Sequence, residues 1–157
     1  AFAMAPQASA EIVSLSGAGF IQQCPCSLSG QQPDIVKGVL TPTDQSTVFA
    51  AVDFPVNGRK ICSVTMVYQD INGNDTMTAR LLRKSFAVGS NVANNPTVVA
   101  TVNSDAGVVN TVRKATTTAI TGPTINEVSG FYYVEVAMPT VNLNLLGVQI
   151  DHRLTCP

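Results

Sequence analysis

The sequence predicts an all-β fold, a two-layer antiparallel sandwich of the jelly-roll kind with about eight to ten strands. Apolar and polar residues alternate with period two in several segments, which indicates strands that bury one face. Asn-Gly pairs stand between such segments, and this dipeptide is a strong signal for a hairpin turn. Only 12% of the 157 residues are charged, and Thr, Val and Asn are abundant, which favours strands over helices.

The alternation defines the expected elements along the chain. Strands are predicted near residues 11–22, 35–41, 46–54, 61–70, 76–84, 96–103, 108–113, 117–121, 131–139 and 145–152. In the four clearest segments the side chains expected to face the core are Cys62, Val64, Met66 and Tyr68; Met77, Ala79 and Leu81; Tyr132, Val134 and Val136; and Leu146, Val148 and Ile150. Asn57-Gly58 and Asn72-Gly73 are expected to form turns between neighbouring strands.

The first ten residues, AFAMAPQASA, differ from the rest of the chain because they are apolar and uncharged. QASA before Glu11 satisfies the small-x-small rule for signal-peptide cleavage, but a basic segment and a longer apolar core are missing. Phe2 and Met4 are two residues apart, so both would enter the pockets of one groove if the segment added a strand to a neighbouring sheet. We therefore expect an N-terminal assembly arm at 1–10 and a single sandwich domain at 11–157.

The four cysteines, an even number in a chain of low charge, are typical of an exported protein with disulfides. A bridge between Cys24 and Cys26, which flank a single proline, would be strained. We expect one of them to pair with Cys62 and the other with Cys156, and the sequence leaves open which pairs with which. The expected location is secreted, extracellular or periplasmic.

Charge and motif patterns argue against several function classes. The net charge is −1 and no run of basic residues is longer than two, so nucleic acid is not an expected partner. No apolar stretch is long enough to cross a membrane. The one histidine, His152, is next to Asp151, and neighbouring residues of a strand point to opposite faces. No nucleophile motif or facing carboxylate pair is recognisable, so neither enzymatic activity nor a cofactor is expected.

The turn near residue 72 is the one candidate for a metal site. Asp70, Asn72, Asn74 and Asp75 offer side-chain oxygens within six residues, and oxygen is the ligand that Ca²⁺ prefers. The EF-hand pattern does not fit, because its sixth and twelfth positions would be Asp75 and Leu81. A hairpin turn accounts for these residues, so no metal is predicted and calcium is a minor alternative.

Carbohydrate binding is the rival function, because β-sandwich lectins and carbohydrate-binding modules stack sugar rings on exposed aromatic side chains. The sequence has no Trp, and the alternation directs Tyr68 and Tyr132 inward. Tyr133 therefore remains as the expected ligand contact. Polar neighbours that could supply hydrogen bonds are Arg80, Lys84, Asn142 and Asn144.

The four alternating segments ICSVTMVYQD, MTARLLRKSF, FYYVEVAMP and LLGVQIDH resemble the strands of small exported bacterial β-sandwich proteins of no assigned role, over roughly residues 60–152. The resemblance implies export and a sandwich fold, and it carries no catalytic residues. Together with the apolar arm, it leads us to predict a non-catalytic, self-assembling structural protein of the cell surface, a homo-oligomer or filament subunit. The alternative is a carbohydrate-binding module or lectin-like domain that contacts a glycan through Tyr133.

Overall fold

The structure is a computed structural model, and it describes residues 10–22, 34–36, 39–41, 45–71, 75–86, 96–105, 107, 109–140 and 142–157. The predicted arm with Phe2 and Met4 lies outside the described residues, as do Cys24 and Cys26. Within the described part, the chain forms eleven strands and one short 3-10 helix, Gly17–Gly19.

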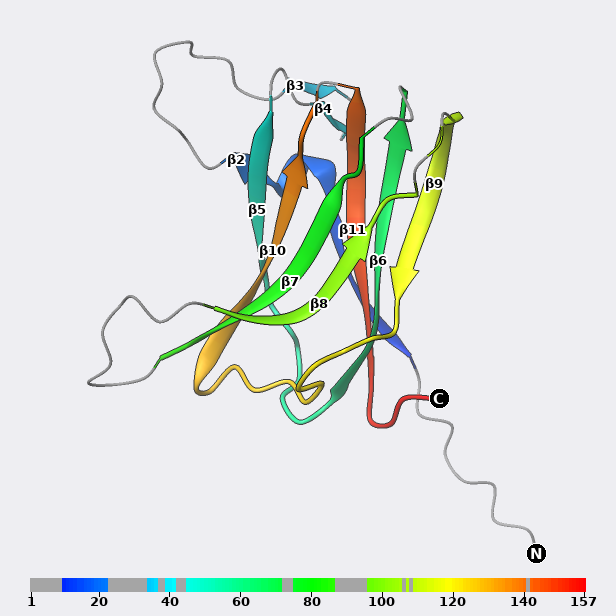
Figure 1. Ribbon diagram of the computed structural model, residues 1–157. Coiled ribbons are helices and arrows are strands. Elements are labelled where there is room, and N and C mark those ends of the chain that lie inside the picture. The colour runs from blue at the N-terminus through cyan, green and yellow to red at the C-terminus, as the bar shows by residue number, and fades with distance from the viewer. Residues whose placement is uncertain are drawn as a thin grey trace, which may run out of the picture.

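The strands form two antiparallel sheets that face each other as the layers of a sandwich (Figure 1). One sheet has the order β3-β4-β11-β6-β9, and β1 also pairs with β11; its strands are β1 (Glu11–Ser16), β3 (Asp34–Val36), β4 (Val39–Thr41), β6 (Lys60–Asp70), β9 (Val109–Thr117) and β11 (Leu143–Arg153). The second sheet has the order β2-β5-β10-β7-β8; its strands are β2 (Ile21–Gln22), β5 (Ser46–Val52), β7 (Thr78–Ser85), β8 (Thr97–Asn103) and β10 (Gly130–Met138). The predicted all-β, jelly-roll-like sandwich is confirmed.

The core lies between the two sheets and is built from the inward faces of their strands. The predicted inward faces of β6, β7 and β10 are confirmed: the buried side chains are Cys62, Val64, Met66 and Tyr68 on β6, Ala79 and Leu81 on β7 with Met77 just before it, and Tyr132, Val134 and Val136 on β10. Period-two alternation holds along these strands because each has one face on the core and one face outward.

The predicted inward face of β11 is wrong at one position. The structure buries Leu145, Val148 and Ile150 and leaves Leu146 half-buried, because the register of β11 on β6 shifts between Leu145 and Gly147. A bulge inserts a residue and reverses the alternation on one side of it. The glycine is required there, since a Cβ atom on Gly147 would meet the carbonyl oxygen of Leu15 in β1.

Three predicted strand boundaries also differ from the structure. The segment 11–22 is divided between β1 and β2, which lie in different sheets, and the 3-10 helix between them makes the crossing. The segment 35–41 becomes the short hairpin pair β3 and β4, whereas the two strands predicted at 108–113 and 117–121 are represented by one strand, β9. Periodicity alone does not reveal a sheet change or an uninterrupted strand.

The described disulfide joins Cys62 to Cys156, so the prediction that each of them pairs with Cys24 or Cys26 is wrong. The physical reason is that β6 and β11 are adjacent antiparallel strands, and the residues that follow β11 return beside the start of β6. The two Cα atoms are 5.3 Å apart although 94 positions separate the residues in sequence.

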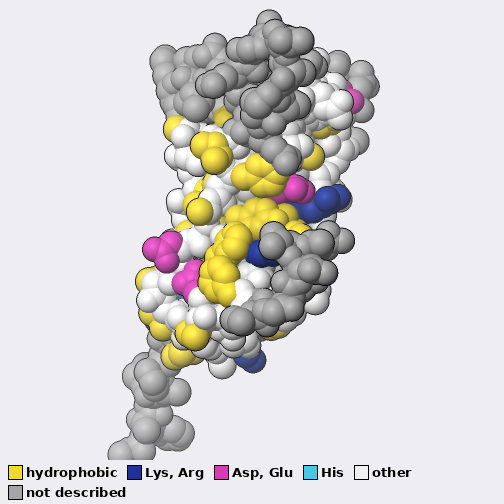
Figure 2. All heavy atoms as spheres, turned by 90° about the vertical axis from the view of Figure 1, so that its left-hand side faces the viewer, with side chains coloured by type: hydrophobic (Ala, Val, Ile, Leu, Met, Phe, Trp, Pro, Cys, Tyr) yellow, Lys and Arg dark blue, Asp and Glu magenta, His cyan; other side chains and the backbone are white. Residues whose placement is uncertain are grey.

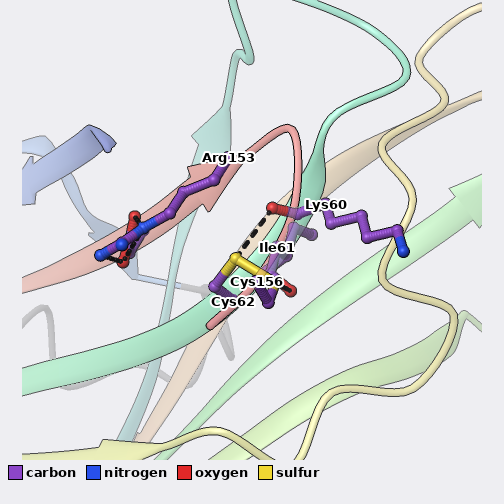
Figure 3. The surroundings of a disulfide bond; sticks show 6 residues. Lys60, Ile61, Cys62, Arg153 and Cys156 are labelled. Atoms are coloured by element: carbon purple, nitrogen blue, oxygen red, sulfur yellow. Dashed lines mark hydrogen bonds and ion pairs between the residues drawn. A yellow bond between two sulfur atoms is a disulfide. The ribbon is translucent and has the colours of Figure 1, made fainter. Parts of the chain in front are cut away.

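The disulfide lies among backbone carbonyl groups at the end of the sandwich where the chain finishes (Figure 3). The Cys62 sulfur is 3.5 Å from the carbonyl oxygen of Lys60, and the Cys156 sulfur is 3.6 Å from that of Ile61. A disulfide sulfur has no hydrogen to donate, so these are packing contacts. The bond therefore holds the C-terminal segment to the edge of the core by its covalent link.

His152 is buried on β11, with 1% of its surface exposed. Its ring meets Phe54 edge to face at a centroid distance of 5.6 Å, and its Nδ1 has no hydrogen-bond partner among the described residues. Asp151 points the other way and pairs with Arg153 at 2.7 Å. Burial lowers the pKa of His152, and the partly opposing charges of Glu11, Arg59 and Asp151 leave that direction unchanged.

Removal of the disulfide is expected to lower the free energy of unfolding by about 2–5 kcal/mol, since in the unfolded chain the bond closes a long loop between residues 94 positions apart, from β6 to beyond β11. The test is denaturant unfolding of the variant Cys62→Ser/Cys156→Ser. The matched control, Cys24→Ser/Cys26→Ser, keeps the described bond. An unfolding midpoint of the first variant equal to that of the unsubstituted protein would contradict the prediction.

Stability is expected to fall as the pH decreases from about 7 toward 5. The unfolded chain takes up a proton on His152 near pH 6.5, whereas the folded chain takes it up only at lower pH, so acid favours the unfolded state in this window. Carboxylates titrate mostly below it. We expect His152→Leu to flatten the dependence of the free energy of unfolding on pH. A histidine titration followed by NMR in the native protein gives a second readout, and a native pKa of 6.5 or higher would refute this expectation.

Candidate functional site

Tyr133, the predicted ligand contact, lies on the face of β10 that points away from the core. Its neighbours along the strand, Tyr132 and Val134, are fully buried, so the alternation directs Tyr133 outward together with Phe131 and Glu135. In the paired strands Tyr133 is in register with Ala51 of β5 and Leu82 of β7.

Tyr133 is part of a continuous line of four aromatic rings, which we call the aromatic row: Phe86, Phe131, Tyr133 and Phe49. The ring centroids of successive members are 5.6, 5.9 and 6.1 Å apart. Phe86 and Phe131 are 59% and 44% exposed. Figure 2 shows one face of the molecule on which hydrophobic side chains run across the middle, with basic and acidic side chains beside them.

The rings of the row come from β5, from β10 and from the residue that follows β7. Phe49 is directed outward because Val48 and Ala50, its neighbours in β5, are buried. Phe86 follows the last residue of β7, and its backbone N–H donates a hydrogen bond to the carbonyl oxygen of Ser129 at 2.9 Å, which holds it against the start of β10. The row therefore begins after β7, follows β10 and ends on β5.

Gly130 allows the start of β10 to approach β7 closely. A Cβ atom at this position would lie 2.5 Å from the carbonyl oxygen of Lys84 and 3.2 Å from a guanidinium nitrogen of Arg83. Arg83 in turn donates hydrogen bonds to the carbonyl oxygen of Asn126 and, at 2.8 Å, to the hydroxyl of Ser129. These contacts fix the loop before β10 and with it the position of Phe131.

Three members of the aromatic row, Phe49, Phe131 and Tyr133, line a shallow depression with a volume of about 600 Å³. Gly19 and Ile21 line it beside β5, and Lys84 and Pro96 line it on the side of β7 and β8. Leu82 is only 4% exposed although it does not belong to the core cluster, because alternation along β7 directs it to the outer face, in register with Tyr133. The depression itself is lined by aliphatic and aromatic residues together with Lys84.

Polar groups flank the row but do not interrupt it. Lys84 is opposite Phe131 in the β7–β10 register, and Arg80 pairs with Glu135 at 3.4 Å. Burial raises the pKa of Tyr133 above its ordinary value, and the nearby charge of Glu135 raises it further, so the hydroxyl stays neutral over the physiological range. This site can offer apolar ring faces together with a neutral hydroxyl at its centre, which suits an uncharged ligand that has both apolar and hydroxyl-bearing surfaces.

Sequence reasoning found Tyr133 but missed Phe131, Phe49 and Phe86. A signal was present for one of them, since Phe131 and Tyr133 are two residues apart in a strand and must share a face. Phe49 and Phe86 belong to other strands, and their proximity depends on the order of strands in the sheet. Asn144, one of the polar neighbours considered with Tyr133, lies in the opposite sheet and hydrogen-bonds to Thr41 and Gln69.

The possible calcium ligands are only partly described. Asp70 is buried at the end of β6, and Asp75 is half-buried beyond the turn, whereas Asn72 and Asn74 lie outside the described residues. Among the residues that the structure describes, no group of three or more His, Cys, Asp or Glu side chains could hold a metal ion. Calcium at this turn stays the minor alternative, because two of its four candidate ligands lie outside the described residues.

A second, smaller hollow of about 350 Å³ lies at the end of the sandwich and is lined mainly by polar side chains, including Arg83, Thr97, Thr124 and Asn126. The guanidinium of Arg83 donates its hydrogen bonds to Asn126, Ser129 and Ser85, and it lies 5.9 Å from the centre of the Tyr132 ring. Its observed contacts are those of an anchor for the loop before β10.

No helix in the described part of the chain is long and apolar enough to span a membrane.

No protein-family model and no curated protein sequence matches the chain. Solved structures do match its fold. A xylan-binding module, CBM15, superposes with a TM-score of 0.56 and 11% identity over 91% of this chain and 97% of that chain. The GH26-CBM35 β-(1,4)-mannanase of Podospora anserina gives 0.52 and 12%, over 93% of this chain and 28% of the enzyme. The isomalto-dextranase of Arthrobacter globiformis gives 0.50 and 14%, over 88% and 23%.

These neighbours show the β-sandwich fold, and they correct the main functional prediction. The prediction of a self-assembling structural subunit is wrong, because the fold matches carbohydrate-binding modules rather than filament or oligomer subunits. The predicted homo-oligomer has no support in these comparisons. The part of the predicted resemblance that stands is the small β-sandwich fold itself.

Proposed function

We propose that the protein is a non-catalytic carbohydrate-binding module that binds a glycan on the aromatic row. The observation that carries the proposal is the row itself, four rings of which each adjoins the next on the outer side of one sheet. The C–H groups of a sugar ring form an apolar face, and stacking this face on an aromatic ring removes both surfaces from water. The sugar hydroxyls then remain at the edges, where Tyr133 and the polar groups beside the row can hydrogen-bond to them.

The fold supports the same function, since a xylan-binding module covers nearly the full length of both chains in the comparison. Xylan is accordingly the first ligand to test, with mannan and dextran next because of the other two neighbours. Secretion belongs to this proposal: the Cys62–Cys156 bond is stable in an oxidising compartment, where polysaccharides are also encountered. The proposal requires no cofactor and assigns no catalytic residue.

Truncation of the two rings on β10 tests the proposal. Tyr133→Ala and Phe131→Ala are each expected to raise the dissociation constant for the bound polysaccharide roughly five- to thirtyfold, corresponding to about 1–2 kcal/mol of lost apolar contact. Affinity electrophoresis in gels that contain soluble xylan, mannan or dextran provides the screen, and calorimetry with the best ligand provides the constants.

The matched control for the ring truncations is Val112→Ala, which removes an exposed apolar side chain, 56% accessible, from β9 in the opposite sheet. This variant is expected to bind as the unsubstituted protein does. Absence of binding to every polysaccharide tested, or binding that is unaffected by Tyr133→Ala, would refute the proposed function.

A further inference from the structure

The aromatic row is not flat, and this feature bears on the physical form of its ligand. Successive rings are inclined to each other by 35° between Phe86 and Phe131, by 32° between Phe131 and Tyr133, and by 47° between Tyr133 and Phe49. No two neighbouring rings are therefore coplanar. A flat surface laid on one ring cannot lie flat on the next.

The side chains around the row also hinder a flat ligand surface from reaching the rings. Phe49, Phe131 and Tyr133 line a depression of about 600 Å³ that Ile21 and Pro96 line on opposite sides, and Ile21 is 73% exposed. The flat face of a polysaccharide crystal would meet the surrounding side chains before it met these three rings. A single chain is narrow enough to enter the depression.

An ion pair and one lysine lie beside the row. Arg80 and Glu135 form the ion pair, so their opposite charges largely cancel at a distance, and Lys84 lines the depression opposite Phe131. Burial raises the pKa of Tyr133 above its ordinary value, which is already well above physiological pH, so its hydroxyl is neutral. The shape of the ligand is a property that this surface can distinguish.

We infer that the aromatic row binds one glycan chain, free of a crystalline lattice, whose successive sugar units rotate relative to each other to follow the inclination of the rings. Rotation about each glycosidic bond lets a separated chain adopt such a twist, and a chain held in a crystal lattice cannot do so. The ligand class is therefore soluble or amorphous polysaccharide. This inference rests on the proposed function and adds the physical form of the ligand.

The row also has two ends, Phe86 and Phe49, and a centre, Phe131 and Tyr133. Each ring in the row adjoins the next at about the same distance, so a short oligosaccharide occupies part of the row and a longer one occupies all of it. Affinity should accordingly rise with the length of the chain until the row is filled. Beyond that length the additional sugar units have no ring to contact.

The experiment compares soluble xylan, mannan and dextran, and oligosaccharides of two to six units from the polysaccharide that binds best, with microcrystalline cellulose and crystalline chitin in pull-down assays. We expect binding to at least one soluble chain, and at least tenfold less protein retained on the crystalline solids. Phe86→Ala and Phe49→Ala should weaken binding of six-unit oligosaccharides about fivefold and should weaken binding of two-unit oligosaccharides less. Tyr133→Ala should weaken both, and Tyr133→Phe, which keeps the ring, should restore most of the affinity.

The outcomes separate the two proposals. Retention on microcrystalline cellulose or chitin that matches retention on soluble chains, and that Tyr133→Ala abolishes, would overturn the inference and leave a carbohydrate-binding module. End variants that weaken short and long oligosaccharides equally would overturn it as well. Absence of binding to any glycan would overturn the proposed function, and the inference with it. Circular dichroism and thermal unfolding of each variant show whether a loss of binding reflects a loss of fold.

Discussion

The pairing of β10 on both of its sides is the constraint on which the candidate site depends. Every residue from Gly130 to Ala137 has a partner in β7, and those from Tyr132 to Met138 have a partner in β5. With Tyr132, Val134 and Val136 in the core, the register leaves Phe131 and Tyr133 outside. A slip of one residue would exchange the two faces and bury the candidate binding surface, so the burial of the core also specifies the site.

Two buried tyrosines connect the core to the loops that support this register. The hydroxyl of Tyr132 accepts a hydrogen bond from the backbone N–H of Asn126 at 3.1 Å, and that of Tyr68 accepts one from the N–H of Asp105 at 2.9 Å. Both side chains are fully buried, and their hydroxyls therefore need such partners. The bond to Asn126 holds the loop before β10, where the carbonyl oxygen of Ser129 also accepts a hydrogen bond from the backbone N–H of Phe86. The core residue Tyr132 thus helps to fix the end of the aromatic row that Phe86 forms.

The sequence predicts those features of the fold that depend on residues close together in the chain, and it does not predict those that depend on distant ones. Alternation within a strand is local, so the inward faces of β6, β7 and β10 could be predicted. The bulge at Leu145–Gly147 depends on the close approach of β1, and alternation failed there. The Cys62–Cys156 pair depends on β6 and β11 being neighbours, which no local pattern reveals.

The candidate site was recognised in sequence by a single residue for the same reason. Phe131 and Tyr133 share a face within one strand, but Phe49 and Phe86 reach them only through the order β5-β10-β7. Because the sequence predicts only one outward aromatic ring, it favours assembly through the N-terminal arm over carbohydrate binding; the arm residues Phe2 and Met4 lie outside the described part of the chain. One isolated tyrosine is a weak signal for carbohydrate binding, whereas the folded sheet brings four rings together.

The twist of the sheet offers a physical origin for the inclination of these rings. A strand twists along its own axis, and neighbouring strands are rotated by roughly 20–25° relative to each other. Phe131 and Tyr133 are on the same strand and are inclined by 32°, whereas Tyr133 and Phe49 are on different strands and are inclined by 47°. Side-chain rotamers add to the backbone twist, but a row that follows a twisted sheet and crosses to its neighbour is not expected to be planar. The inferred preference for a single chain that can twist then follows from building the site on a sheet whose strands twist for steric reasons.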